Sequence, residues 1–375
     1  MEKIYFDNAA TTPLDREVLD AMMPYFTEKF GNPSSIYSYG RETRLAVENS
    51  RKMVAKLLHA HPSEIFFTSG GTESSNTAIN AAVNDLGCTH IITSPIEHHA
   101  TLHTVEHLQH KGLVSVSYLN ILENGHVDIN HLEELLKNNS QTTLVTILHA
   151  NNEIGNITDI ETVSNLCKKY QAFFHCDTVQ TVGHFNIDLS KLNVHFITGA
   201  GHKFHGPKGV GILYVNKEVK ITPHILGGSQ ERNMRAGTEN VYGIVGFAKA
   251  LENAMNNLET DTEYIKGLKY YLAEQLLQHI PGIQLNGDTF GNSLYTVLNV
   301  GFPKTPKTEM ILFNLDVNHF CVSGGSACTS GANVGSHVIN AFKDASTQET
   351  IRFSFSKHNK KEEIDSLILI LKEII

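Results

Sequence analysis

Short apolar runs recur along the first two thirds of the chain, and segments with helical periodicity separate several of them. The apolar runs predict strands at 64–68, 90–93, 113–119, 143–149, 172–176, 194–198 and 209–215. The segments between them predict helices at roughly 72–84, 98–110, 128–137 and 159–170. Strand and helix in alternation predict a largely parallel sheet covered by helices on both faces. In such folds ligands bind in the loops at the carboxyl ends of the strands.

The pattern changes after about residue 256. A long helix is expected at about 257–279, and a short helix is expected to begin at Ser336. An amphipathic helix is expected at the C-terminus. Strands are expected near 283–286, 293–300, 319–323 and 349–355. This part therefore reads as a smaller α+β domain.

Composition narrows the class of protein. The chain has 375 residues and a formal net charge of −9, which argues against a general nucleic-acid binder. It has no apolar stretch close to the ~18 residues of a membrane helix, and no signal-peptide core at its start. Its five cysteines are odd in number and widely spread, which fits a reducing compartment. We expect a soluble, cytoplasmic protein with no direct contact to nucleic acid or membrane.

The stretch FFTSGGTESSNTAI, residues 66–79, predicts a strand, a glycine turn and a helix. The free N–H groups at such a helix start can bind an anion, and glycines let the backbone approach it closely. A capped helix after a tight turn would give the same pattern. The stretch is not a P-loop, because no Gly-Lys-Ser/Thr follows.

A lysine and an acid follow two later strands. Lys203, in ITGAGHKFHGPKG, could be a surface charge or a Schiff-base lysine, and Lys208 is an equal candidate on spacing. Asp177, in FFHCDTVQ, could be a structural acid or the partner of a cofactor nitrogen. A phosphate cradle, a lysine and a strand-end acid on one α/β scaffold together indicate a pyridoxal phosphate (PLP) enzyme.

Two further patterns leave alternatives open. His99, His103 and His107 share one helical face, where solvated histidines are expected rather than a metal site; no metal is predicted. His98 should stand at the start of that helix, on the ligand side of the sheet. Arg352, in TIRFSFS, could be a half-exposed charge or the fork that holds a substrate carboxylate.

The stretch CVSGGSACTSG, residues 321–331, holds two cysteines among small residues. Cys321 ends an apolar run and is expected in the core at a strand end. Cys328 has no bulky neighbour in sequence. Glycines around it would let a loop move, so a reactive thiol could travel between two positions.

The chain resembles the cysteine desulfurases of the NifS/IscS kind, within the class V, fold-type I PLP enzymes. The resemblance spans nearly the whole chain. Its segments are YFDNAATTP (5–13), FGNPSS (30–35), TSGGTESSN (68–76), EHHATL (97–102), HANNEIG (149–155), HCDTVQTVG (175–183), GHKFHGPKG (201–209), MRAGTEN (234–240) and SGGSACTS (323–330).

The resemblance implies a role for each matching residue. Lys203 is the Schiff-base lysine, His98 stacks on the cofactor ring and moves protons, and Cys328 is the nucleophile. The cofactor is also held by Gly71, Thr72 and His202 at the phosphate, Asp177 at the ring nitrogen, Gln180 at the phenolic oxygen, and Asn152. Asn152 and Arg352 hold the substrate carboxylate. Thr238 reaches the phosphate of the neighbouring subunit, which implies a homodimer.

The same resemblance implies fold, activity and partners. The expected fold is a fold-type I PLP transferase with a mainly parallel sheet in a large domain at 15–255. A smaller α+β domain is expected from 1–14 and 256–375. The implied reaction converts L-cysteine to L-alanine, with sulfur passing as a persulfide to Cys328. An acceptor protein then takes the sulfur, either an iron–sulfur scaffold or a tRNA-thiolating enzyme. Selenocysteine lyase or another class V PLP activity is the alternative.

One position departs from the family pattern at the phosphate. Residue 200 is Ala, where the family often has a Ser that bonds the cofactor phosphate. Thr198 or water would have to supply that hydrogen bond.

Overall fold

The computed structural model describes residues 3–324 and 336–375. The predicted nucleophile Cys328 and most of its glycine-rich segment lie outside the described residues. The expectation that this segment moves the thiol between two positions therefore also concerns residues outside the described ranges.

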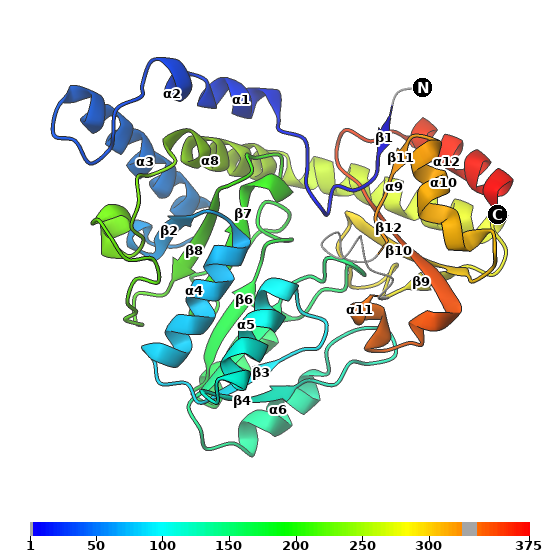
Figure 1. The fold of residues 1–375 in the computed structure, drawn as a ribbon, viewed down its shortest axis with the longest axis horizontal. Coiled ribbons are helices and arrows are strands. Elements are labelled where there is room, and N and C mark those ends of the chain that lie inside the picture. The colour runs from blue at the N-terminus through cyan, green and yellow to red at the C-terminus, as the bar shows by residue number, and fades with distance from the viewer. Residues whose placement is uncertain (1–2, 325–335) are drawn as a thin grey trace.

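A seven-stranded sheet forms the centre of the larger part (Figure 1). Its strands are β2 (Ile65–Thr68), β3 (His90–Thr93), β4 (Ser115–Tyr118), β5 (Thr143–Leu148), β6 (Phe173–Asp177), β7 (Phe196–Ala200) and β8 (Gly211–Val215). The strand order is β2-β8-β7-β6-β5-β3-β4. Only β8 runs antiparallel to its neighbours, and the other pairs are parallel. The predicted largely parallel sheet is confirmed.

Both faces of the central strands of this sheet are buried, as their apolar runs predicted, whereas the edge strand β4 is partly exposed. Ile91 and Leu144 point to one hydrophobic cluster, whereas their chain neighbours Ile92 and Val145 point to another. Successive side chains of a strand face opposite sides, so these pairs show that helices cover both faces. The covering helices that the sequence predicted are α4 (Gly71–Asn84), α5 (His99–His110), α6 (Ile129–Lys137) and α7 (Ile160–Lys169).

Four helices of the larger part were not predicted. They are α1 (Arg16–Met22), α2 (Pro24–Thr27), α3 (Ser38–Leu57) and α8 (Val241–Asn256). The buried face of α3 contains Thr43, Ser50 and Arg51 beside Val47 and Val54. Polar residues on the packed face hide the apolar period that predicts a helix.

Among its described residues, the smaller part holds two short sheets. A three-stranded antiparallel sheet has the order β12-β10-β9, and β1 pairs with β11 in parallel. Its elements are β1 (Ile4–Tyr5), α9 (Leu258–His279), β9 (Gln284–Asn286), β10 (Val297–Pro303), α10 (Ile311–Val317), β11 (Phe320–Cys321), α11 (His337–Asn340), β12 (Gln348–Ser354) and α12 (Lys361–Ile374).

Two expectations for this part are wrong in detail, and one helix was not predicted. The strand predicted at 293–300 begins at Val297, because the N–H of Val297 bonds back to Leu294 in a turn. The apolar run before Cys321 is mostly helical, since Ile311 and Leu315 are buried four residues apart in α10. Cys321 is half-buried in the two-residue strand β11 and is not a core residue.

Separate hydrophobic clusters fill the two parts. One cluster joins α9, α12, β10 and β12, and Phe6 from the N-terminal segment belongs to it. The large sheet has its own clusters, to which Val338 and Ile339 of α11 add. Apart from α11, which packs on the large sheet, these clusters support our proposal of a large domain at 15–255 and a small domain from 1–14 and 256–375.

No helix within residues 3–324 and 336–375 combines the length and apolar character needed to span a membrane.

Gly211 offers a test of how tightly the sheet packs beneath the carboxyl edge. An added Cβ would lie 2.5 Å from the carbonyl oxygen of Gly199 and 2.7 Å from Gly70 Cα. We expect Gly211→Ala to lower the free energy of unfolding by about 1–3 kcal/mol, because backbone atoms must move. Urea unfolding followed by circular dichroism measures this.

Gly267→Ala is the matched control. Gly267 lies in α9 with nothing within 4 Å of an added Cβ. We expect it to raise the free energy of unfolding by about 0.5–1 kcal/mol through helix propensity. Equal effects of the two substitutions would contradict the packing argument.

Candidate functional site

Most of the predicted site residues line one cavity of about 250 Å³ at the carboxyl edge of the large sheet. The predicted residues around it are Gly71, Thr72, His98, Asn152, Asp177, Gln180, His202, Lys203 and Arg352. They come from both parts of the molecule, since Arg352 lies on β12. Thr238 does not line this cavity.

The turn between β2 and α4 forms one end of the cavity. Gly70 has a φ of 151°, which L side chains rarely adopt. At Gly71 an added Cβ would lie 2.6 Å from Val179 Cγ2, so the backbone itself lines the space there. The first N–H groups of α4 have no intrahelical partner, and together with the helix dipole they favour an anion. This geometry supports the predicted phosphate cradle.

Lys203 follows β7 in a single 3₁₀ turn, Gly201–Lys203. Its Nζ lies 2.6 Å from the carbonyl oxygen of Ala9 and 3.0 Å from that of Ala10. Lys208, the alternative on spacing, does not line the cavity. We therefore propose Lys203 as the reactive amine.

Lys203 packs against the N-terminal segment at Ala9 and Ala10. Thr12 Oγ1 donates to the carbonyl oxygen of His202 at 2.9 Å, and Gln180 Nε2 donates to the carbonyl oxygen of Ala9 at 3.1 Å. Sequence reasoning matched this segment to a family but assigned it no role. Its own carbonyl groups contact the lysine and the glutamine, and backbone contacts of this kind leave no signature in residue types.

Asp177 ends the central strand β6 and is 3% exposed. Its Oδ1 accepts hydrogen bonds from the N–H of Val179 at 3.0 Å and from Thr198 Oγ1 at 3.4 Å. Burial raises the pKa of the Asp177 carboxyl. A cationic group held against it would offset that burial cost and keep it ionised.

His98 caps the start of α5. Its Nδ1 accepts a hydrogen bond from the N–H of Ala100 at 3.1 Å, so in the neutral ring the proton sits on Nε2. Burial, followed by the charge of Lys203, lowers the pKa of His98 to about 4. A neutral His98 can exchange a proton through Nε2.

The histidine row beside His98 lies mostly in solvent. His103 and His107 are exposed, as expected for surface histidines, while the His99 ring stacks on His103 with centroids 4.8 Å apart. Within the described ranges, ligand atoms gather at metal-binding spacing only at Asp15, His205 and His358. There Lys357 Nζ already lies 2.6 Å from the Asp15 carboxylate.

Arg352 is buried, not half-exposed. Its Nη2 lies 2.7 Å from Asp7 Oδ1 and its Nη1 lies 2.9 Å from the carbonyl oxygen of Asn152. Nε is buried and has no hydrogen-bond partner among the described residues. Asp7 is a further residue that sequence reasoning missed, although it stands in the matched segment YFDNAATTP.

Glu97 is a second missed residue, although it begins the matched segment EHHATL. It is 1% exposed, and its Oε1 accepts a hydrogen bond from Ser94 Oγ at 2.6 Å. Burial, with a smaller contribution from the charge of Asp177, raises the pKa of Glu97 to about 8. Glu97 is therefore mainly a neutral acid at pH 7.

Comparisons with known proteins identify the family of this chain. The family model described as aminotransferase class-V matches residues 4–367. A cysteine desulfurase IscS from Dictyoglomus turgidum is 43% identical over all of this chain and 94% of its own length. A putative cysteine desulfurase IscS 1 from Bacillus subtilis is 42% identical over all of this chain and 99% of its own length. A solved structure described as a NifS-like protein has a TM-score of 0.91 at 38% identity and 99% coverage of each chain.

The chain therefore belongs to the class V aminotransferase family. Within it, the chain is a NifS/IscS-like PLP-dependent enzyme with the fold-type I architecture that the sequence predicted.

The cavity fits this cofactor. The glycine turn before α4 offers N–H groups for a phosphate, the buried Asp177 suits a cationic ring nitrogen, and Lys203 supplies an amine for the aldehyde. Ala200 lies at the same end of the cavity as Gly71 and has no hydroxyl group to donate to a phosphate. Thr198, the alternative donor, already bonds Asp177 through its Oγ1.

The pKa of Glu97 predicts a pH dependence of stability. The pKa of Glu97 in the folded chain lies above the ordinary value of 4.5, so its neutral form favours the folded state. This contribution is fully present below pH 4.5. This stabilisation is lost as the pH rises toward about 8. The loss for one proton is at most about 1.4 kcal/mol per pH unit.

Glu97→Gln keeps the shape and removes the proton. As the pH rises from 4.5 to about 8, we expect the unfolding free energy of the wild type to fall relative to that of the variant. Urea unfolding of both holoenzymes at several pH values measures it. A constant difference across that range would contradict the raised pKa.

Proposed function

We propose that this chain is a cysteine desulfurase that converts L-cysteine to L-alanine and takes the sulfur as a persulfide on Cys328. The convergence of Lys203, His98, Asp177 and Arg352 on one cavity carries the proposal. Similarity to relatives named cysteine desulfurase supports the substrate. The balance is simple: the Cys328 thiol and L-cysteine give a Cys328 persulfide and L-alanine.

In this proposal a first group of residues holds the cofactor. Gly71, Thr72 and His202 hold the phosphate of PLP, Asp177 pairs with its ring nitrogen, and Gln180 bonds its phenolic oxygen. Lys203 binds the cofactor covalently. When bound, PLP supplies an electron sink that makes the Cα proton of the substrate acidic.

The substrate is held and deprotonated by side chains of the same cavity. Arg352, whose Nε is buried without a partner among the described residues, and Asn152 bind the substrate carboxylate. Asp7 holds the other end of the Arg352 guanidinium at 2.7 Å and fixes its plane. Lys203 and the neutral His98 move protons at Cα and at the departing groups.

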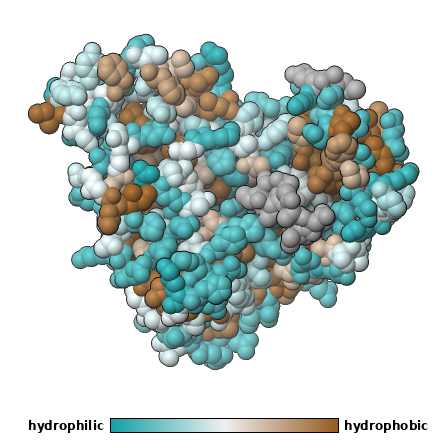
Figure 2. Space-filling view, viewed as in Figure 1, coloured by the Kyte–Doolittle hydropathy of each residue, from teal (hydrophilic) through white to brown (hydrophobic). Residues whose placement is uncertain are grey.

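We further propose a homodimer. Thr238 is exposed and lies outside its own chain's cavity, which suits contact with a neighbouring subunit. Large apolar side chains are also exposed around α1–α3, and hydrophobic colour marks this region in Figure 2. They are Met23 at 45%, Phe26 at 48%, Phe30 at 70%, Ile36 at 86%, Tyr39 at 52% and Leu45 at 60% exposed. An exposed apolar patch of this kind marks a protein contact.

The sulfur acceptor is proposed to be a protein, either an iron–sulfur scaffold or a tRNA-thiolating enzyme, met in the cytoplasm. A thiolate is the form of Cys328 that takes up sulfur. Trapping the mixed disulfide that Cys328 forms in lysate identifies the acceptor.

The first test is turnover of free L-cysteine with a reductant. We expect sulfide and alanine in equal amounts, no turnover by Lys203→Ala, and no sulfide release by Cys328→Ser. Cys328→Ser should keep the cofactor absorbance, which separates the thiol from cofactor binding. Full activity of Cys328→Ser would overturn the proposal, and faster turnover of selenocysteine would assign a selenocysteine lyase.

The second test restores a donor at the phosphate. Ala200 lines the cavity on β7, so Ala200→Ser places a hydroxyl beside the proposed phosphate position. A hydrogen bond to a charged group contributes about 1.5 kcal/mol, so we expect about tenfold tighter PLP binding. Titration of the apoenzyme followed by cofactor absorbance measures it. Unchanged or weaker binding would contradict the assigned phosphate position.

A further inference from the structure

Strand β2 is an outer strand of the large sheet, and in the part of the chain that the structure describes it pairs with β8 alone. An edge strand has N–H groups on its open side that need other partners. On β2 and just after it, two such groups two residues apart bond to carboxylates. Phe67 N donates to Glu231 Oε2 at 2.8 Å, and Ser69 N donates to Glu73 Oε2 at 2.9 Å.

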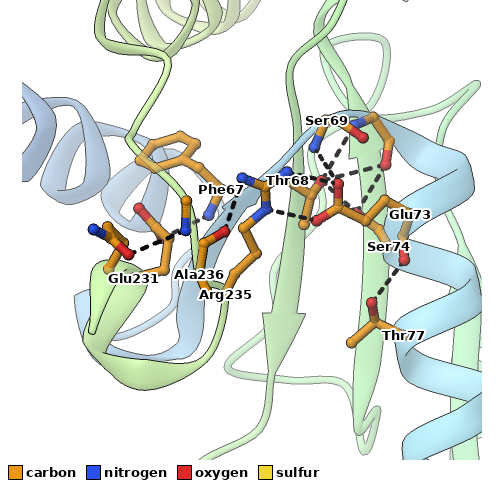
Figure 3. A network of polar contacts seen from close by, with 12 residues as sticks. Phe67, Thr68, Ser69, Glu73, Ser74, Thr77, Glu231, Arg235 and Ala236 are labelled. Atoms are coloured by element: carbon orange, nitrogen blue, oxygen red, sulfur yellow. Dashed lines mark hydrogen bonds and ion pairs between the residues drawn. The ribbon is translucent and has the colours of Figure 1, made fainter. Parts of the chain in front are cut away.

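Each of these carboxylates is held by an arginine. Glu73 accepts from Arg235 Nε at 3.0 Å and from Arg235 Nη2 at 3.2 Å. Glu231 accepts from Arg51 Nη1 at 2.7 Å and from Arg51 Nη2 at 2.9 Å. Figure 3 shows Arg235 reaching Glu73 at the start of α4, with Glu231 beside Phe67. Two-pronged arginine pairs fix direction as well as distance.

These contacts join two segments far apart in the sequence. Glu73 follows Gly71 and Thr72 directly, and Arg235 precedes Thr238 by two intervening residues. Ser69, Arg235 and Thr238 border the same hollow on the surface. The glycine turn at the start of α4 and the segment that carries Thr238 are therefore linked by hydrogen bonds.

The segment that carries Glu231 and Arg235 is held in an unusual backbone shape. Glu231, Arg232 and Asn233 have φ values of 45°, 57° and 66°, which cost free energy for residues other than glycine. Such a run persists only where surrounding contacts fix it. The buried Arg51–Glu231 pair, with side chains 2% and 3% exposed, supplies that contact.

We propose that Glu73 and Arg235 are positioning residues that couple PLP binding to subunit association. The inference rests on the proposed roles of Gly71, Thr72 and Thr238. The Glu73–Arg235 pair fixes the position of the phosphate cradle in its own subunit relative to the Thr238 segment. That segment contacts the partner subunit. PLP then strengthens the dimer, and the dimer strengthens PLP binding by the same factor.

The experiment compares Arg235→Gln with the wild type. PLP affinity is measured by titrating apoenzyme and following cofactor absorbance. The dimer dissociation constant is measured by sedimentation with and without PLP. We expect PLP binding about tenfold weaker, and a PLP effect on dimerisation reduced by the same factor. We expect kcat at saturating PLP to stay within about threefold, since the pair does not line the cavity.

Arg232→Gln is the matched control in the same segment. Arg232 pairs at 2.8 Å with Glu48, and its guanidinium is exposed, away from the cradle. We expect PLP affinity and dimerisation within about twofold of the wild type. Arg235→Lys keeps the charge without the two-pronged geometry, and it replaces Arg235→Gln if that variant does not fold. We expect its loss of PLP affinity to lie between those of the wild type and Arg235→Gln.

Two results would overturn the inference. One is unchanged PLP affinity in both Arg235 variants. The other is a PLP effect on dimerisation that equals the wild-type value while PLP affinity falls. Failure of the proposed function is distinct, since it would appear in the wild type as PLP binding without turnover of cysteine.

Discussion

The buried carboxylate of Asp177 imposes the main electrostatic constraint on this cavity. It ends the central strand β6, where water is excluded and an isolated charge is costly. Glu97 lies close enough for their charges to interact, and both pKa values are raised. The low dielectric tolerates one ionised acid near Lys203 and His98 more readily than two. A neutral Glu97 leaves Asp177 as the acid that a cation can stabilise.

The fold could be read from the sequence where burial was two-sided. Strands such as β3 and β5 are apolar on both faces, and their positions were predicted to within a residue or two. The prediction failed where packing used polar groups, as in α3, where Arg51 lies inside the protein on Glu231. No element was predicted at α10, because a short apolar run does not distinguish a strand from a buried helix turn.

The site was predicted best where one residue type carries the chemistry. A lysine, a strand-end acid and a glycine turn point to PLP without any contact map, and the family resemblance assigned the rest. The contacts that backbone groups make were not predictable, because the carbonyl groups of Ala9 and Ala10 look like those of any other residue. Glu73 and Arg235 stood in matched segments, yet only the fold brings them within hydrogen-bond distance.

The N-terminal segment joins the two parts of the molecule at the cavity. β1 pairs Ile4 with Phe320, Asp7 binds Arg352, and the next residues contact Lys203. The described part of this segment contributes no strand to the seven-stranded sheet. Cleavage after it would therefore remove contacts of Lys203 and Arg352 while leaving every strand of that sheet in the chain.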